Sequence, residues 1–194
     1  MRFLPGLICL LPLLSPLAHA ELIDDVNDRG ELRIALEANT PPFNFKKDDK
    51  LEGFEVELGQ LLANELEVRA DFVVTDGSDL LTGVESGKYD IAINHITETP
   101  ALKERFDFSE PYRRTDAQLI AQKDEPRSML LLQSLTEEKP KASSPVNLAI
   151  PFQKGNPAFH ASLENALQRI KADGRLKALE EKWFGPDAGV TPKQ

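Results

Sequence analysis

Cysteine and long apolar runs are nearly absent from this sequence, and each absence excludes a class of protein. The one cysteine, Cys9, lies within the N-terminal segment 1–20, so the rest of the chain can form neither a disulfide nor a thiolate metal site. After residue 20, no segment is long and apolar enough to span a bilayer. We therefore expect no cofactor, no metal site and no stable membrane insertion.

Positive charge is also scarce. The sequence has 23 Lys and Arg residues against 32 Asp and Glu residues, and one of the basic residues is Arg2. Without the N-terminal segment the balance is 22 against 32, a net charge of −10. Nucleic acids and anionic membrane surfaces attract basic proteins, so neither is an expected partner.

The N-terminal segment 1–20 has the pattern of a cleavable signal peptide. Arg2 supplies the positive start, Phe3–Leu14 the apolar stretch, and Ala18-His19-Ala20 the small-residue cleavage signal. Cleavage after Ala20 predicts an exported, soluble product, most simply in a bacterial periplasm.

Strand and helix patterns alternate through the next part of the chain. Short apolar runs suited to strands are separated by residues that recur at the spacing of a helix face. These elements are Glu31–Glu37, Phe54–Leu66, Ala70–Val74, Leu80–Val84 and Tyr89–Ile93. The βαβαβ order predicts an α/β fold with a parallel sheet. Lys46–Lys50 is interpreted as a charged loop.

The C-terminal part predicts two more helices. Asn156 and Pro157 begin the first of them, and Leu176–Phe184 forms the second, followed by a loose tail over 187–194. The first helix has an apolar face of Phe159, Leu163, Ala166, Leu167 and Ile170. Upstream, the segment 123–146 is interpreted as a linker between two predicted strands, Ala117–Ala121 and Val146–Phe152.

Polar residues follow the third predicted strand. Asn94, His95 and Thr97 lie just past its C-terminal end, where open α/β sheets place their ligands. Thr99-Pro100 then has the pattern of a capped helix start, whose free N–H groups suit a carboxylate. His95 and Glu98 could form an acid–base or metal pair, but no third ligand stands at suitable spacing, and a solvated polar turn is the simpler interpretation. The sequence therefore predicts a small-ligand site and no enzyme.

Five segments, in this order, resemble those of the family 3 bacterial extracellular solute-binding proteins, the periplasmic receptors of polar amino-acid ABC transporters. The segments are LRIALEANTPPFNF, LEGFEVELGQLLANELEV, SGKYDIAINHITETP, FDFSEPY and ADGRLKALEEKWFG. The resemblance implies a type II periplasmic binding fold, in which two α/β lobes are joined by crossing strands and hold the ligand between them. It assigns 21–122 and 147–186 to lobe one, with Ala117–Gln122 and Asn147–Phe152 as crossings. The segment 123–146 then stands where lobe two should be, as a vestigial stump.

The resemblance also implies the ligand-binding positions. Glu37 matches an acidic residue that faces the ligand amino group, and Thr40 and Gly77 stand where members carry aromatic residues. Leu102 occupies the place of the arginine that clamps the ligand carboxylate. The predicted ligand-binding residues are Glu37, Thr40, Phe43, Asn94, His95 and Thr97.

Two functions follow as expectations. The first is a periplasmic solute-binding protein of the polar amino-acid ABC transporter type, whose binding is weak or altered because of Leu102 and the short segment 123–146. Its partners would be a small polar solute, such as an amino acid, and an ABC permease or other periplasmic protein. The second is a single-lobe interaction module that docks on a permease, sensor or exported enzyme. An exposed apolar patch at Pro42, Phe43, Phe45 and Leu102 would favour the second.

Overall fold

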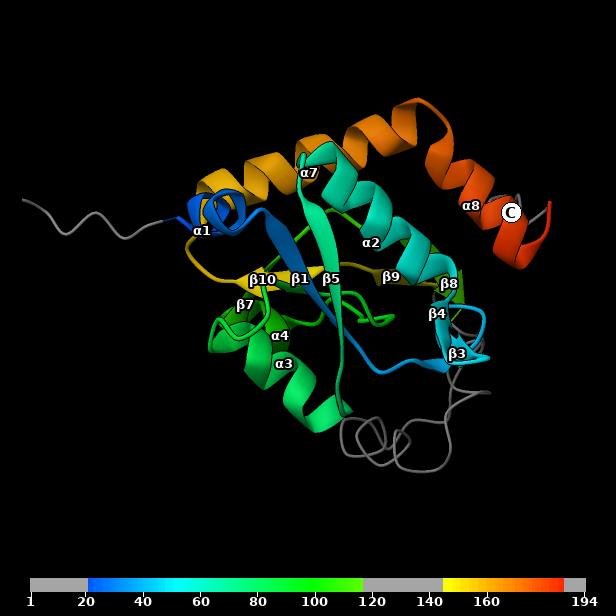
Figure 1. The fold of residues 1–194 in the computed structure, drawn as a ribbon, viewed down its shortest axis with the longest axis horizontal. Helices are drawn as coiled ribbons and strands as arrows, with labels where there is room; N and C mark the ends of the chain where they lie inside the picture. The colour runs from blue at the N-terminus through cyan, green and yellow to red at the C-terminus, as the bar shows by residue number, and fades with distance from the viewer. Residues whose placement is uncertain (1–20, 117–144, 187–194) are drawn as a thin grey trace, which may run out of the picture.

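A five-stranded sheet organises the computed structural model, which describes residues 21–116 and 145–186 (Figure 1). The strand order is β5-β1-β6-β10-β7. The strands are β1 (Glu31–Leu36), β2 (Asn39–Thr40), β3 (Asn44–Lys47), β4 (Lys50–Glu52), β5 (Arg69–Val74), β6 (Ile91–Ala92), β7 (Phe106–Phe108), β8 (Arg113–Asp116), β9 (Pro145–Leu148) and β10 (Pro151–Gln153). The helices are α1 (Leu22–Arg29), α2 (Phe54–Glu65), α3 (Gly77–Glu85), α4 (Pro100–Arg105), α7 (Pro157–Ala172) and α8 (Arg175–Phe184).

The predicted βαβαβ unit is confirmed. β1 runs parallel to β5, with Glu31 opposite Arg69, and parallel to β6, with Ile34 opposite Ile91. α2 and α3 connect these three strands. β10 joins the sheet antiparallel to both β6 and β7, so the complete sheet is mixed. The third strand is shorter than the predicted Tyr89–Ile93.

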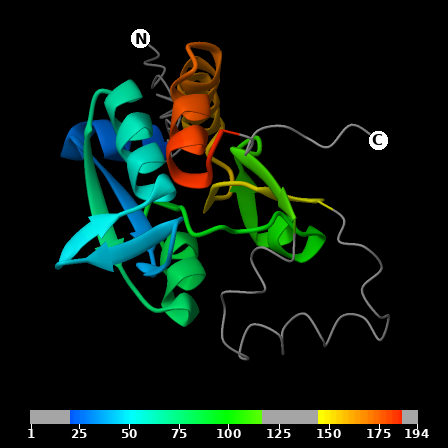
Figure 2. The same ribbon diagram turned by 90° about the vertical axis from the view of Figure 1, so that its right-hand side faces the viewer.

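Helices cover both faces of the sheet. α1, α2, α7 and α8 form one layer, and α3 and α4 lie on the opposite side (Figures 1 and 2). The strands supply both layers because successive side chains point to opposite faces. In β1, Ile34 packs toward the α2 layer and Ala35 toward the α3 layer. The predicted apolar face of α7, from Phe159 to Ile170, is buried as expected.

One local prediction is corrected, and one helix was not predicted. Lys46–Lys50 is not a loop, because β3 and β4 pair as a hairpin around Asp48 and Asp49. Both aspartates have positive φ, 48° and 60°, the conformation that a two-residue hairpin turn requires. The helix α1 was not predicted, since only Leu22 and Val26 of its residues are buried.

The strands β8 and β9 form a separate antiparallel pair. Arg113 lies opposite Leu148, and Asp116 opposite Pro145. The single predicted strand Val146–Phe152 is therefore wrong: it is divided between β9 and β10, which belong to different sheets. The predicted stump includes Pro145 and Val146, which belong to β9. Residues 1–20, 117–144 and 187–194, with the signal peptide, most of the stump and the tail, lie outside the described residues.

Candidate functional site

Glu37 and Asn94 meet at the carboxyl edge of the parallel strands. Glu37 follows β1, and Asn94 lies two residues after β6. The backbone N–H of Glu37 donates to Asn94 Oδ1 at 3.1 Å, and Asn94 Nδ2 donates to Glu37 Oε2 at 2.7 Å. Asn94 is buried and Glu37 half-buried. The two predicted site residues therefore form one reciprocal pair, of which Glu37 is the partly exposed member.

The Glu37 carboxylate lies against the first residue of α3. A Cβ atom added to Gly77 would stand 2.9 Å from Glu37 Oε1, so the absence of a side chain at Gly77 makes room for the carboxylate. Free N–H groups and a partial positive charge at a helix N-terminus favour a carboxylate. Gly77 therefore bears on the position of the Glu37 carboxylate.

A second layer of polar residues lies beneath this pair, and sequence reasoning missed it. Asn44 Nδ2 donates to Asn94 Oδ1 at 3.2 Å and to Glu55 Oε2 at 2.5 Å. Asn44 and Glu55 are both fully buried. One signal could have revealed Glu55: it precedes Leu58 and Leu62 by three and seven residues, so it is an acidic residue on the apolar face of α2.

His95 lies in a turn that Glu55 holds. Its backbone N–H donates to Glu55 Oε1 at 2.6 Å, its φ is 42°, and its ring packs 5.7 Å from that of Phe43. The Tyr112 hydroxyl donates to the same Glu55 oxygen at 2.6 Å. Burial, and then the nearby Glu55 carboxylate, raise the pKa of Tyr112 well above its ordinary value, so its hydroxyl keeps its proton at neutral pH.

Three predicted site residues stand apart from the Glu37–Asn94 pair. Phe43 is 1% exposed and packs against Phe184, so its ring belongs to the core. Thr40 is buried, and its hydroxyl donates to Asn39 Oδ1 at 2.8 Å. Thr97 is half-buried and forms a backbone bridge with Leu148 of β9.

The exposed apolar patch that would have favoured a docking module is not seen at these positions, because Phe43 is buried. Of its other members, Pro42, Phe45 and Leu102 are half-buried rather than exposed. Phe45 packs edge-on against Trp183 of α8, with ring centroids 5.9 Å apart.

The predicted start of α4 is confirmed, but its cations are already engaged. The Thr99 hydroxyl accepts the Leu102 N–H at 3.3 Å, as an N-cap does. Lys103 pairs with Glu98 at 2.5 Å, and Arg105 pairs with Glu85 at 2.5 Å. Both cations of this helix are therefore engaged in ion pairs with glutamates.

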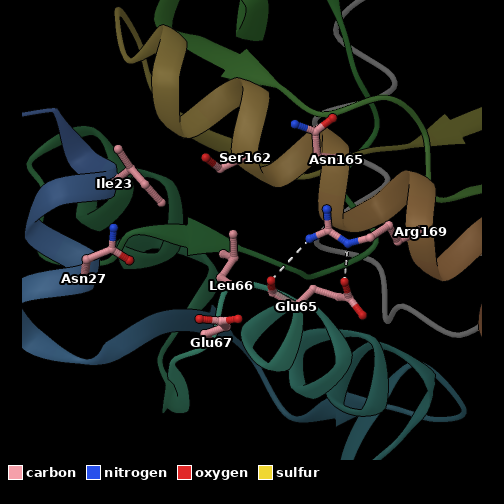
Figure 3. Close-up of a pocket in the computed structure, with 8 residues that line it drawn as sticks. All are labelled: Ile23, Asn27, Glu65, Leu66, Glu67, Ser162, Asn165 and Arg169. Carbon is pink, nitrogen blue, oxygen red and sulfur yellow. Dashed lines mark hydrogen bonds and ion pairs between the residues drawn. The ribbon is translucent and has the colours of Figure 1, made fainter.

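An open hollow of about 350 Å³ lies elsewhere, where α1, α7 and the end of α2 meet (Figure 3). Its lining residues are Ile23, Asn27, Glu65, Leu66, Glu67, Ser162, Asn165 and Arg169. Glu65 is bound to Arg169 and to Arg175, and hydrogen bonds from Arg169, then Arg175, lower the pKa of Glu65. These bonds join α2 to the C-terminal helices.

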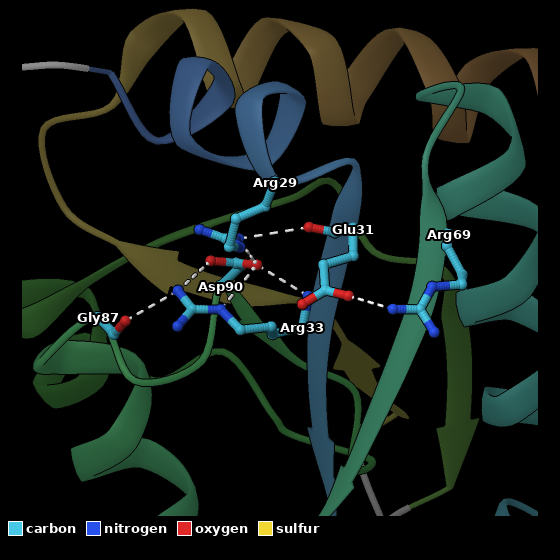
Figure 4. Close-up of polar contacts among 6 residues, drawn as sticks. All are labelled: Arg29, Glu31, Arg33, Arg69, Gly87 and Asp90. Carbon is cyan, nitrogen blue, oxygen red and sulfur yellow. Dashed lines mark hydrogen bonds and ion pairs between the residues drawn. The ribbon is translucent and has the colours of Figure 1, made fainter.

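The amino edge of the sheet carries an ion cluster around Asp90 (Figure 4). Asp90, fully buried, accepts from Arg29 at 2.5 Å and from Arg33 at 2.7 Å. The Arg33 side chain also donates to the Gly87 carbonyl at 2.9 Å. Each carboxylate oxygen of Asp90 therefore has an arginine partner.

Two classes of feature are not seen within residues 21–116 and 145–186. No group of three or more His, Cys, Asp and Glu residues there could hold a metal ion, so His95 and Glu98 gain no further ligand in this part of the chain. Nor does that part contain a helix with the length and hydropathy needed to cross a membrane.

The model of the bacterial extracellular solute-binding proteins, family 3, matches residues 32–186. The chain belongs to this family. The L-cystine-binding protein TcyJ of Escherichia coli strain K12 is 26% identical over 235 aligned positions, which cover 88% of each chain. This family is one of extracellular binding proteins, and the resemblance drawn from the sequence is confirmed.

Solved structures confirm the type II periplasmic binding fold. An ancestral amino acid-binding protein, AncCDT-1, described as a precursor of cyclohexadienyl dehydratase, has a TM-score of 0.68 at 23% identity, over 85% of this chain and 100% of that one. The L-cystine solute receptor of Neisseria gonorrhoeae, in its unliganded open conformation, has a TM-score of 0.67 at 23% identity, over 89% and 100%.

Proposed function

We propose that this chain is a periplasmic receptor of the polar amino-acid ABC transporter type, without catalytic activity, that binds its solute weakly. The Glu37–Asn94 pair contacts the ammonium end of that solute. The single observation that carries the proposal is half-buried Glu37 at the carboxyl edge of the sheet, whose carboxylate accepts from an amide and, among residues 21–116 and 145–186, pairs with no cation.

The chemistry of Glu37 fits an ammonium group. Its carboxylate accepts from Asn94 Nδ2, and it takes part in no ion pair among residues 21–116 and 145–186. A carboxylate binds a cationic donor more strongly than a neutral one. Several relatives support the same class of ligand by name, among them the arginine-binding extracellular protein ArtP of Bacillus subtilis, 30% identical over 60% of this chain.

Leu102 explains why binding is weak. In family members the arginine at this position clamps the ligand carboxylate with two hydrogen bonds, which leucine cannot make. A charge-assisted hydrogen bond contributes about 1.5–3 kcal/mol, so its loss weakens binding by roughly ten- to a hundredfold. Lys103 and Arg105 cannot compensate, since each is paired with a glutamate.

A reduced second lobe would weaken binding further. Only residues 117–144 lie between β8 and β9, too few for a βαβ unit that is followed by its own helices. The alignment with TcyJ spans 235 positions, more than the 194 residues of the whole chain, which supports the interpretation that the relative carries internal residues without a counterpart here. With little to close over it, the solute stays in contact with water, which screens its charges.

Restoring the arginine tests this proposal. Leu102→Arg is expected to tighten the binding of a polar amino acid by about ten- to a hundredfold, measured by calorimetric titration against the twenty amino acids. Gln168→Arg, which adds the same charge on the exposed surface of α7, is the matched control. Micromolar affinity of the unmodified chain, or no gain from Leu102→Arg, would contradict the proposal.

The same shortening favours a second candidate, a single-lobe interaction module that docks on another periplasmic protein. Size-exclusion chromatography with light scattering separates the two. A monomer whose melting temperature rises with one solute supports the receptor. A stable oligomer that responds to no solute supports the interaction module.

A further inference from the structure

We propose that Asn44 and Glu55 are positioning residues for the solute-contacting pair. They fix the side-chain amide of Asn94 so that its NH₂ group faces Glu37. The proposal rests on the proposed function in one respect, since it takes Glu37 and Asn94 as the solute contact.

The orientation of Asn44 is set by the backbone. The N–H of Ala38 donates to Asn44 Oδ1 at 2.9 Å. A backbone N–H can only donate, so the oxygen of the Asn44 amide must lie on this side. Its NH₂ group is therefore turned toward Glu55 and Asn94, and it donates to both.

The orientation of Asn94 is set by Asn44 together with the Glu37 backbone N–H. Asn94 Oδ1 accepts from the Glu37 backbone N–H at 3.1 Å and from Asn44 Nδ2 at 3.2 Å. A reversed amide would place the Asn94 NH₂ group against two donors. Only the observed orientation satisfies all these groups, and it directs Asn94 Nδ2 to Glu37 Oε2 at 2.7 Å.

Glu55 anchors this chain of hydrogen bonds. Its oxygens accept from Asn44, from the His95 backbone and from the Tyr112 hydroxyl, at 2.5–2.6 Å. Because Glu55 is fully buried, water cannot replace a lost donor, and each unmade bond is costly. Glu55 thus fixes two neighbours of Asn94: the side chain of Asn44 and the turn at His95, which follows Asn94 in the chain.

The place where the network ends favours positioning over a purely structural role. The cluster around Asp90 ends in two arginine cations that neutralise its carboxylate, with side chains 30% and 25% exposed. The network at the carboxyl edge runs outward from buried Glu55 through Asn44 and Asn94 to the half-buried carboxylate of Glu37.

A pair of variants separates positioning from stability. Asn44→Asp replaces the donating NH₂ group by an oxygen that faces two acceptors, on Glu55 and Asn94. Adding Glu55→Gln supplies a donor to the new carboxylate at position 44 and restores that contact. The Asn94 oxygen still faces an acceptor in the double variant, because position 44 no longer donates.

The readouts are the melting temperature and the side-chain amide resonances of Asn94 in ¹⁵N NMR spectra, without and with ethylammonium chloride. We expect Asn44→Asp to lower the melting temperature and shift the Asn94 resonances. We expect the double variant to recover much of the melting temperature while the Asn94 resonances stay shifted and their response to ethylammonium is lost. Asn165→Asp, at an exposed asparagine of α7, should change neither.

Two results would overturn the proposal: Asn94 resonances unchanged in Asn44→Asp, or Asn94 resonances that return to their original positions in the double variant. Failure of the proposed function has a different signature. In that case the unmodified chain shows no Asn94 response to ethylammonium beyond that to sodium chloride, while the solute-free resonances still report whether position 44 orients the amide.

Discussion

The two edges of the central sheet each bury one carboxyl group, and they satisfy it in opposite ways. At the amino edge, Asp90 is enclosed by Arg29 and Arg33. At the carboxyl edge, Glu55 accepts from two side chains and one backbone N–H, and no ion pair involves it within the described residues. The first arrangement neutralises its charge and stabilises the fold. The second satisfies its carboxyl group by hydrogen bonds alone, and these lead through Asn44 and Asn94 to Glu37, the proposed ammonium contact.

Removing Asp90 should have the largest effect on stability. Asp90→Ala leaves two arginines without their shared partner, and both are less than a third exposed. We expect the free energy of unfolding in urea to fall by about 3 kcal/mol. The Asn94 resonances should keep their positions, because the two edges share no hydrogen bond.

Glu31→Ala is the matched control for Asp90→Ala. It also removes an arginine partner, but Arg69 is 74% exposed, so the loss should stay within about 1 kcal/mol. Equal losses of unfolding free energy for the two variants would show that the buried ion pairs of Asp90 stabilise the fold no more than the exposed pair of Glu31.

Glu65 tests the same two-arginine arrangement at the surface. Arg169 and then Arg175 hold the pKa of Glu65 below its ordinary value of 4.5. Above pH 4.5 the carboxylate is ionised in both the folded and the unfolded chain, so its stabilisation is fully present. Below that pH the unfolded chain takes up the proton first, and the stabilisation is lost as the pH falls through the folded pKa.

Glu65→Gln should therefore flatten the acid limb of the stability curve. We expect its melting temperature to fall less than that of the unmodified chain between about pH 6 and about pH 3.5. At neutral pH the variant should be destabilised less than Asp90→Ala, since water screens a surface pair. A parallel fall in both proteins would show that Glu65 contributes nothing to acid sensitivity.

Gly77→Ala should change stability least and still disturb the carboxyl edge. The new methyl group would lie 2.9 Å from Glu37 Oε1, and the flexible carboxylate can move away, so we expect a change in unfolding free energy within about 0.5 kcal/mol. The Asn94 resonances should then shift less when ethylammonium is added, because the displaced carboxylate binds the cation less well. Ser78→Ala, at the next exposed position of α3, should leave that response intact.

Local patterns were enough to predict the βαβαβ unit, α7, α8 and the cap at Thr99. Each depends on the spacing of apolar residues or on a few neighbouring residues. The hairpin β3–β4 was missed because its charged residues mask a strand pattern, and the split between β9 and β10 was missed because the apolar run continues across it.

The site was harder to predict than the fold. Glu37 and Asn94 could be placed at one edge, since the ends of parallel strands meet there. The roles of Asn44 and Glu55 depend on hydrogen bonds to residues up to 57 positions away along the chain, as between Tyr112 and Glu55. The packing of the Phe43 ring on Phe184 joins it to a C-terminal helix that no local pattern connects to it.

The pairing of β8 with β9 has a consequence for engineering. Asp116 and Pro145 lie opposite each other at the end of the pair, and directly opposed residues of antiparallel strands have Cα atoms about 5 Å apart. The β8–β9 pair therefore holds Asp116 and Pro145 close together. Loop-closure entropy grows only slowly with length, so a reporter domain with adjacent termini could be grafted between them at small cost in folding free energy.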